Sequence, residues 1–331
     1  MHRMKRLLLL ALVATCCVGP IHGGALSGWR RWLFEWPDMS FIPAWMSLPW
    51  GPVPDWGAVR GHIDCRNDMK AAMADVAMPC KNGTGLTLPS VCNLKIAILQ
   101  MRAGEYTRPG TKYTFQEPVH NLNKKYCFRW HFCSHSLLSD PTFDEAKFPG
   151  YKERHPAWMK VLAAHSLVSK GEYDWVMWMD GDAAIIDHSV DVRFIIAQAP
   201  NTTQFIVSHD AWHTVGDGQA NTGVWLIKVN KESVQMLEEW YKLPDTDTEM
   251  SKFKTGHPWE QAVFNSKIFR TYEKVIHRLP FCWLFGHPWA LLDQPFIAHM
   301  PGLTNENKLT ERLRYFSFWD AQTIAGQQYL D

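Results

Sequence analysis

What the sequence lacks excludes several kinds of protein. It has no Cys-x-x-Cys pair, which argues against a zinc site built from paired thiolates. Lys and Arg number 34 against 33 Asp and Glu, so the formal charge is +1 and gives no basic excess with which to bind nucleic acid. The apolar run near the N-terminus spans Leu7 to Val18, which is short of the roughly 20 apolar residues that a membrane-spanning helix needs. No repeat or low-complexity segment interrupts the remainder.

The N-terminal segment has the pattern of a secretory signal. Basic residues between Arg3 and Arg6 precede the apolar run, and small residues follow it. We expect residues 1–24 to be a cleaved signal peptide; the alternative is a short uncleaved signal anchor that associates with a membrane. Either form places the rest of the chain in the lumen of the secretory pathway. Glycosylation sequons at Asn82 and Asn201 agree with this location.

Cysteine usage fits the same compartment. Of the 8 cysteines, two lie in the apolar run and six remain for the folded part. An even number in an oxidising compartment predicts disulfides, although six cysteines allow 15 pairings and the sequence leaves the choice open. The six are Cys65, Cys80, Cys92, Cys127, Cys133 and Cys282.

Composition divides the rest of the chain. Residues 25–91 begin with tryptophans and closely spaced prolines, which disfavour long helices and predict a stem. Apolar runs that resemble strands then alternate with helical patterns over residues 92–302, which predicts an α/β sandwich with a mostly parallel central sheet. The chain is 46% hydrophobic, enough for a substantial core. Residues 303–331 are predicted to be a C-terminal tail.

The expected strands are residues 94–99, 128–132, 174–179, 205–208, 224–229, 275–279 and 296–298. The expected helices are residues 118–126, 156–171, 190–198, 232–241 and 256–269.

Two carboxylates follow the most apolar of these strands. The run Trp175–Met179 shows no alternation, as expected for a strand covered on both faces, and it ends at Asp180 and Asp182. Ligands of open α/β sheets bind beyond the carboxyl ends of strands. We therefore expect the two aspartates to hold a cation or a phosphate-bearing ligand; the alternative is a turn whose aspartates cap backbone amides. His299, after another apolar run, could add an imidazole ligand or be a core histidine.

Other polar residues at expected strand or helix ends have two readings each. His209 and Asp210 follow a strand and could bind a ligand, or form a plain turn. His257 and Trp259 lie where a helix is expected to begin, so they could stack on a ligand, with a buried tryptophan as the equal alternative.

A set of motifs in a fixed order carries a family resemblance. It consists of NKKYCFRWHF, a Trp-x-Lys helix, DWVMWMDGDAAI, FIVSHD, NTGVWLIK, EQAVFN and FIAHMPG, and spans roughly Asn93 to Gly302. In this order the chain resembles glycosyltransferase family 34, whose members move galactose, mannose or xylose from a nucleotide sugar to a glycan in the Golgi. The resemblance implies a GT-A-like, Rossmann-type catalytic domain, a nucleotide-diphosphate sugar donor and an oligosaccharide or glycoprotein acceptor. With such substrates, His209 and Asp210 could bind the donor or the acceptor, and His257 and Trp259 could stack on the acceptor.

The resemblance also implies a metal site. Asp180 and Asp182 match the Asp-x-Asp that holds manganese and the sugar nucleotide, with Asp182 as the more direct ligand. His299 matches a late histidine that ligates the metal beside the diphosphate. A metal ion there stabilises the charge that develops on the leaving diphosphate, so these three residues would be ligands and not an acid and a base.

Four further residues are assigned by the resemblance. Asn221 and Gly223 match an Asn-Thr-Gly that borders the donor sugar. Glu260 and Gln261 match an acidic-Gln pair near the reacting centre, although an aspartate is common where this chain has Glu260. The family is described as retaining. For Gln261 we hypothesise that its side-chain carbonyl stabilises an oxocarbenium-like sugar.

Three other kinds of protein could carry such an aspartate pair. A metal-dependent phosphohydrolase typically has a threonine or valine soon after the aspartates, where this chain has Ala183 and Ala184. A calcium-binding loop needs oxygen side chains at alternate positions and a glycine at the sixth, whereas this stretch has Ala184 and Ile185 there. A catalytically silent, lectin-like glycan-binding protein remains the main alternative. The sequence leaves the sugar, the acceptor, the linkage and the oligomeric state open.

Overall fold

The computed structural model describes residues 93–102, 116–130, 132–139, 141–210, 219–284, 296–301, 316–317 and 320. All of them belong to the compact unit Pro49–Asp331. The predicted signal segment, the whole predicted stem, most of the tail, Asn82 and three of the six cysteines lie outside the described residues, so the domain boundaries stay predictions. Within the described part, no helix is both long and apolar enough to cross a membrane.

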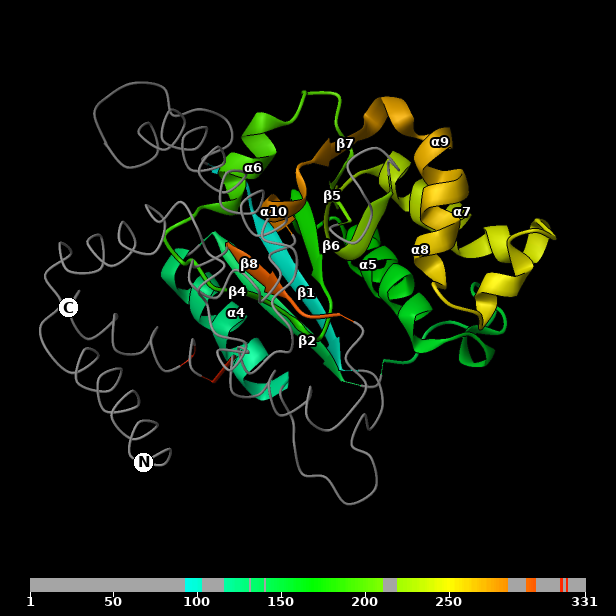
Figure 1. Cartoon of the computed structure of the whole chain (residues 1–331), viewed down its shortest axis with the longest axis horizontal. Helices are drawn as coiled ribbons and strands as arrows, with labels where there is room; N and C mark the ends of the chain where they lie inside the picture. The colour runs from blue at the N-terminus through cyan, green and yellow to red at the C-terminus, as the bar shows by residue number, and fades with distance from the viewer. Residues whose placement is uncertain are drawn as a thin grey trace, which may run out of the picture. The chain divides into compact units, whose positions relative to one another are not determined.

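A six-stranded sheet forms the centre, in the order β2-β1-β3-β6-β5-β7 (Figure 1). Every neighbouring pair is parallel except the two that involve β6, which is antiparallel to both β3 and β5. The sheet is therefore mostly parallel, as predicted. Its strands are β1 (Ile96–Arg102), β2 (Cys133–Ser139), β3 (Trp175–Met179), β5 (Phe205–His209), β6 (Ala220–Lys228) and β7 (Ile276–Leu279).

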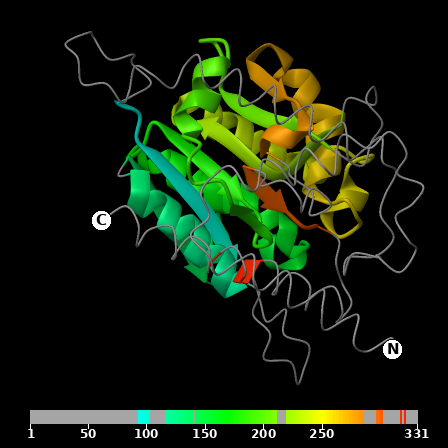
Figure 2. The ribbon, with the colours of Figure 1, turned by 60° about the vertical axis from the view of Figure 1, so that its left-hand side comes forward.

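Helices cover both faces of this sheet (Figure 1, Figure 2). One face packs against α5 (Met159–Lys170), α7 (Lys231–Thr246) and the segment from α8 (Glu260–Val263) through a π-helical turn (Phe264–Ile268) to α9 (Phe269–Thr271). The other packs against α4 (Gln116–Trp130), α6 (Val192–Gln198) and α10 (Phe281–Leu284). Short 3-10 turns occupy Tyr151–Glu153, Pro156–Trp158, Ser251–Lys254 and Glu273–Val275. The α/β sandwich is confirmed.

Strand β3 shows why the apolar run predicts its own position. All five of its residues are buried. Successive side chains of a strand point to opposite faces, so Val176 and Trp178 join the core under α5 and α7, while Met177 joins the core under α4 and α6. A strand buried on both faces needs no polar alternation. The chain leaves β3 at Asp180, which lies at the carboxyl end of this central strand.

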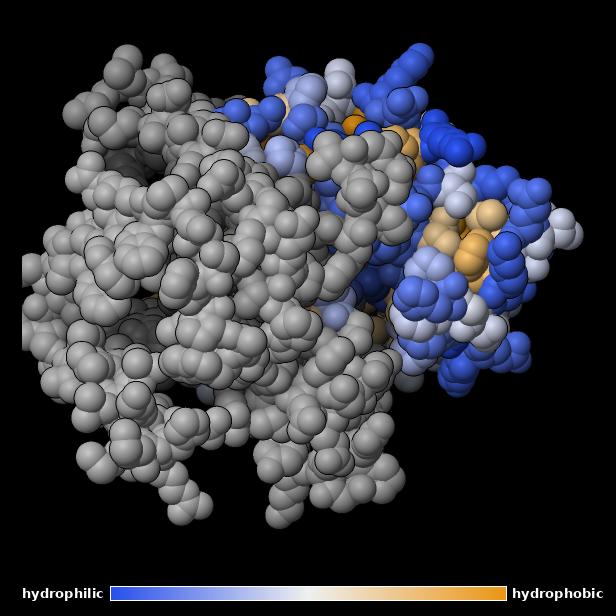
Figure 3. Space-filling model, viewed as in Figure 1, coloured by the Kyte–Doolittle hydropathy of each residue, from blue (hydrophilic) through white to orange (hydrophobic). Residues whose placement is uncertain are grey.

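A two-stranded sheet, β4 (Ala183–Ile185) and β8 (Ile297–His299), lies beside this edge. The strands pair antiparallel, with Ala183 opposite His299. Large hydrophobic side chains that are exposed in the described part are Phe128 and Leu137. The described surface that Figure 3 shows is otherwise mostly hydrophilic with small apolar patches.

Two local predictions were wrong. The strand expected at residues 128–132 is the end of α4, which continues to Trp130, and β2 begins only at Cys133. The helix extends because Tyr126, Cys127 and Trp130 all pack on its core side. A disulfide between Cys127 and Cys133 spans the connection. The second error concerns β6, which begins at Ala220 and so includes the Asn-Thr-Gly expected to precede it.

Candidate metal and donor site

The aspartate pair occupies a tight turn at the end of β3. Asp180 N donates to Gly223 O at 2.8 Å, which extends the pairing of β3 with β6. Ala183 N then donates to Asp180 O at 3.0 Å, closing a β-turn over Asp180–Ala183. Gly181 is not among the glycines with positive φ, so the turn does not require its conformational freedom. The turn places both carboxylates just beyond the carboxyl end of the strand.

Pairing of β4 with β8 brings His299 to the same place. Met300 N donates to Asp182 O at 3.1 Å, next to the Ala183 and His299 pair. The Nε2 atom of His299 lies 3.4 Å from Oδ1 of Asp182 and 3.9 Å from Oδ2 of Asp180. The structure thus brings His299 to the two aspartates, from which it is far apart in the sequence.

The three side chains offer ligand atoms within 4.8 Å of one another. His299 is buried, whereas the side chains of Asp180 and Asp182 are 28% and 17% exposed, so the cluster opens to solvent on the aspartate side. Two carboxylates and an imidazole make a mixed oxygen and nitrogen donor set, which suits divalent ions such as manganese. Gly223 lies against the imidazole and leaves no space for a side chain. The residues present therefore fit a divalent metal.

Lys160 is the buried cation of the site. Its role was not predicted from the sequence. Its Nζ lies 2.8 Å from Oδ1 of Asp180 and 2.9 Å from Oε1 of Glu260, and it donates to Thr222 O at 3.3 Å. Burial alone would lower the pKa of Lys160, but the two carboxylates outweigh it and raise that pKa above its ordinary value. Trp178 Nε1 also donates to Asp180 Oδ1, at 2.8 Å. The signal in the sequence was a lysine on the apolar face of a helix.

Glu260 begins α8 and is buried. Its Oε1 accepts from Thr222 Oγ1 at 3.1 Å as well as pairing with Lys160. Its Oε2 has no hydrogen-bond partner among the described residues. Burial raises the pKa of Glu260, and the charge of Lys160 opposes that rise only in part. One oxygen of this carboxylate is therefore left for a ligand.

Gln261 joins a second polar group around Asp210. Its Oε1 accepts from Thr222 N at 3.0 Å and from Thr222 Oγ1 at 3.3 Å, and its Nε2 donates to Asp210 Oδ2 at 3.2 Å. Asn221 Nδ2 donates to the same Asp210 oxygen at 3.4 Å, and Asn221 Oδ1 accepts from Gly223 N at 2.9 Å. Asp210, Asn221 and Gln261 are thus brought together, with the Gln261 carbonyl oxygen directed at β6.

His209 ends β5 and pairs with Ala220 of β6. Burial and the charge of Arg278 lower the pKa of its imidazole.

Trp259 has one indole face covered by His155, with ring centroids 3.7 Å apart and the planes nearly parallel. His257 meets the same indole edge-on at 4.7 Å. Trp259 is a bulky residue at a φ of 53°, directly before Glu260. Since His155 already covers one indole face, Trp259 in this structure mainly braces the start of α8.

Comparison of the sequence with protein-family models and with curated proteins finds no match. Comparison of the fold with solved structures does. A glycosyltransferase involved in glycosylation of the major capsid of PBCV-1 matches at 16% identity and a TM-score of 0.50, over 68% of this chain and 99% of that one.

Two other matches have lower scores. GlyE of Streptococcus pneumoniae TIGR4 is 13% identical, over 71% of this chain and 64% of that one, with a TM-score of 0.43. Mouse xyloside xylosyltransferase 1 is 11% identical, over 64% of this chain and 99% of that one, with a TM-score of 0.37. The central sheet, its helices and the match to the viral structure together show a GT-A-like glycosyltransferase fold.

Proposed function

We propose that the protein is a metal-dependent glycosyltransferase that moves a sugar from a nucleotide diphosphate to a glycan acceptor. The observation that carries the proposal is the convergence of Asp180, Asp182 and His299 at the end of β3 in a glycosyltransferase fold. A divalent ion held there, which we propose is Mn²⁺, would stabilise the negative charge that develops on the leaving diphosphate.

The chain's own residues divide the remaining work. Asp180 and Asp182 hold the metal side of the donor, and Lys160 holds the Asp180 carboxylate in place through contacts of 2.8 Å and 3.2 Å with its two oxygens. The free Oε2 of the buried Glu260 is available to accept a hydrogen bond from a sugar hydroxyl. Asn221, Gly223 and Asp210 line the donor side, and His209, next to Asp210 at the end of β5, stays a donor-site prediction.

Gln261 is proposed as the group nearest the reacting sugar. For its carbonyl to stabilise an oxocarbenium-like sugar, Oε1 must exchange its bonds with Thr222 for the substrate. A retaining, front-face transfer needs no enzyme nucleophile, only an acceptor hydroxyl held beside the leaving diphosphate. Gln261→Ala tests the role: with saturating donor, turnover near that of the wild type would exclude it.

The finer assignments rest on the sequence motifs. We propose membership of glycosyltransferase family 34, with galactose, mannose or xylose as the transferred sugar. The signal-like N-terminus and the sequons support a location in the secretory lumen, with the Golgi as the proposed compartment.

The test uses the full chain, a panel of nucleotide sugars and Mn²⁺, with released nucleoside diphosphate as the readout. Asp182→Ala should abolish release. Asp174→Asn is the matched control, because Asp174 lies at the other end of β3 and its side chain accepts a hydrogen bond from Lys95 N there. Glycan binding without release from any donor would instead favour the lectin-like alternative, and an active Asp182→Ala variant would mean that the site is misplaced.

A further inference from the structure

The segment that carries the aspartates has little backbone support of its own. β4 is 3 residues long and pairs only with β8 in a two-stranded sheet. Isolated two-stranded sheets are marginally stable. On the β8 side, Asp182 O accepts from Met300 N and Ile186 N donates to Phe296 O. Because these groups alternate along a strand, Ala183 O and Ile185 N point to the opposite edge.

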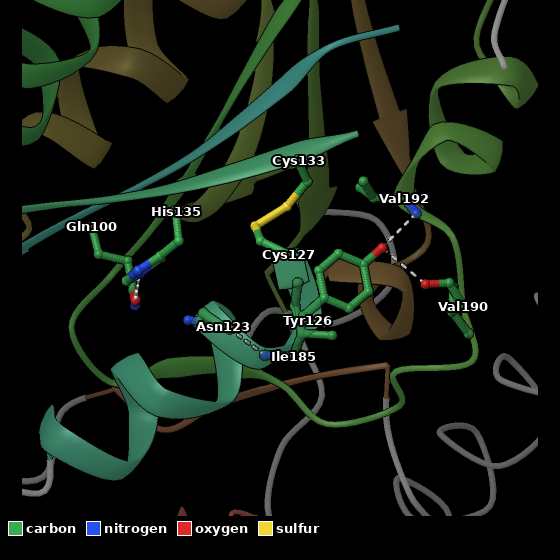
Figure 4. Close-up of a disulfide and its surroundings, with 9 residues drawn as sticks. All are labelled: Gln100, Asn123, Tyr126, Cys127, Cys133, His135, Ile185, Val190 and Val192. Atoms are coloured by element: carbon green, nitrogen blue, oxygen red, sulfur yellow. Dashed lines mark hydrogen bonds between the residues drawn. A yellow bond between two sulfur atoms is a disulfide. The ribbon is translucent and has the colours of Figure 1, made fainter. Parts of the chain in front are cut away.

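A side chain of α4 occupies that opposite edge. Asn123 Nδ2 donates to Ala183 O at 3.2 Å, and Asn123 Oδ1 accepts from Ile185 N at 2.8 Å. One amide therefore makes the two bonds that a neighbouring strand would make. Asn123 is fully buried, and Figure 4 shows it directed at Ile185. Without it, the Ile185 amide would be buried without its partner, and Ala183 O would keep only its bond from Gln100.

A second buried amide holds the turn itself. Gln100 of β1 donates from Nε2 to Asp180 O and to Ala183 O, both at 3.2 Å. Its Oε1 lies 2.9 Å from His135 Nε2 (Figure 4) and 3.0 Å from His120 Nδ1. The carbonyl end faces the histidines, so the amino end faces the turn.

The helix that carries Asn123 is itself fixed to the sheet and to the following segment. The hydroxyl of Tyr126 donates to Val190 O and accepts from Val192 N, each at 2.9 Å. The Cys127–Cys133 disulfide joins the same turn of α4 to β2 (Figure 4). The Asn123 amide is thus carried on a helix with little freedom to move.

We propose that Gln100 and Asn123 are positioning residues for the metal site. By holding Asp180 O, Ala183 O and Ile185 N, they fix the turn between the two aspartates and, through the pairing of β4 with β8, the position of His299. The inference rests on the proposed metal-dependent function for its consequence, but its geometry is independent of that function. Partners that orient metal ligands typically contribute 10-fold to 100-fold to metal affinity.

The test compares Asn123→Leu, which keeps the shape and removes the hydrogen bonds, and Gln100→Met with the wild type. The first readout is hydrogen exchange of the Ile185 amide in metal-free full-length protein, which should accelerate at least tenfold in Asn123→Leu. The second readout is the Kd for Mn²⁺, measured from the electron paramagnetic resonance signal of free Mn²⁺. This Kd should rise about 10-fold to 100-fold in both variants.

The matched control is Asn230→Ala. Asn230 caps α7 by accepting from Ser233 N and lies outside the metal site, so its loss should change stability and leave both readouts unchanged. If Asn123→Leu does not fold, Asn123→Ser, which leaves room for a bridging water, should show smaller changes of the same sign.

The outcomes separate this inference from the proposed function. Unchanged Ile185 exchange, or Mn²⁺ affinity within twofold of wild type in variants that fold, overturns the positioning role. Faster exchange together with no Mn²⁺ binding by the wild type overturns the proposed function. Gln100 and Asn123 would then hold the turn for structural reasons alone.

Discussion

A Cβ atom on Gly223 would lie 2.0 Å from Cε1 and 2.6 Å from Nε2 of His299. The backbone of β6 and the buried imidazole are therefore in direct contact, and any side chain at position 223 must displace the ring. The Asn-Thr-Gly motif ends in glycine here because the imidazole of His299 fills the space that a Cβ would take. The ring is buried and has little room to move.

Gly223→Ala should weaken the metal site more than it weakens the fold. Overpacking of this kind typically costs about 1–3 kcal/mol of stability, while a displaced ligand should lower Mn²⁺ affinity at least tenfold. Mn²⁺ titration and thermal unfolding of the same samples measure the two effects. Gly181→Ala is the comparison, since its Cβ would meet nothing closer than 3.6 Å, and it should cost clearly less affinity. Equal losses in the two variants would contradict the contact as the cause.

Lys160→Met should be strongly destabilising. The change leaves Glu260 and Asp180 without the cation they share, and removal of one partner of a buried ion pair typically costs about 3–5 kcal/mol. Urea unfolding at neutral pH measures the loss. Adding Glu260→Gln to the same protein should recover part of it, because the stranded buried charge is then removed.

Lys147→Met provides the matched control for Lys160. Lys147 lies 3.1 Å from Glu238, but its side chain is 43% exposed, so water replaces most of the interaction. Such surface pairs contribute about 0–1 kcal/mol. A loss in Lys160→Met as small as that in Lys147→Met would show that the buried pair does not hold the site together.

The sequence was sufficient where one physical signal dominates. The uninterrupted apolar run of β3 predicts a strand buried on both faces, and the helix stop at Gly171 is confirmed by its left-handed backbone. The direction of β6 was not predictable, because an apolar run reads the same in parallel and antiparallel strands. The end of α4 was misplaced because aromatic residues suit strands and buried helix faces equally.

The site was predictable only in part. The Asp-x-Asp at a strand end indicated a ligand site, but its approach to His299 depends on the pairing of β4 with β8, which the residues alone do not indicate. Lys160, Gln100 and Asn123 were missed because their partners are mostly backbone atoms and distant carboxylates. All three are polar residues within an apolar pattern. Such a pattern predicts that the residue is buried, but it does not indicate which groups it contacts.

Stability should fall as the pH drops from 6.5 toward 4. Burial, with help from the nearby charge of Arg129, lowers the pKa of His188 to about 4, although its bond with Ile185 O opposes the shift. In the unfolded chain His188 takes up a proton at about pH 6.5, whereas in the folded protein it does so only near pH 4. Between these two values the unfolded state binds more protons, so the free energy of unfolding falls as the pH falls. The shift corresponds to about 3 kcal/mol at the lower end.

His188→Gln should make this fall smaller, and the free energy of unfolding at pH 7.5 and pH 4.5 measures the difference. His135, whose pKa burial also lowers to about 4, accounts for part of the fall that remains. Asn230→Ala is the control: it removes a helix cap and no titrating group, so it should lower stability equally at both pH values. The histidine account is contradicted if the acid-induced loss is the same in His188→Gln and in wild type.

The Cys127–Cys133 disulfide should stabilise the fold. It should also support the hydrogen bonds by which Asn123 holds Ala183 O and Ile185 N, next to the two aspartates. It closes a short loop, with a sequence separation of 6, for which chain entropy predicts about 2 kcal/mol. A reductant would also act on Cys282, which is disulfide-bonded too, so the double variant Cys127→Ser and Cys133→Ser isolates the effect.

We expect the double variant to unfold at lower urea with an unchanged slope, and its Ile185 amide to exchange faster than in the wild type, because Asn123 sits one turn before Cys127 on α4. Native-state exchange then decides between two roles. If global stability falls while exchange at Ile185 keeps its ratio to exchange in β3, the disulfide acts on the whole fold. A selective increase at Ile185 shows that the disulfide holds α4, and therefore Asn123, against the turn that carries Asp180 and Asp182.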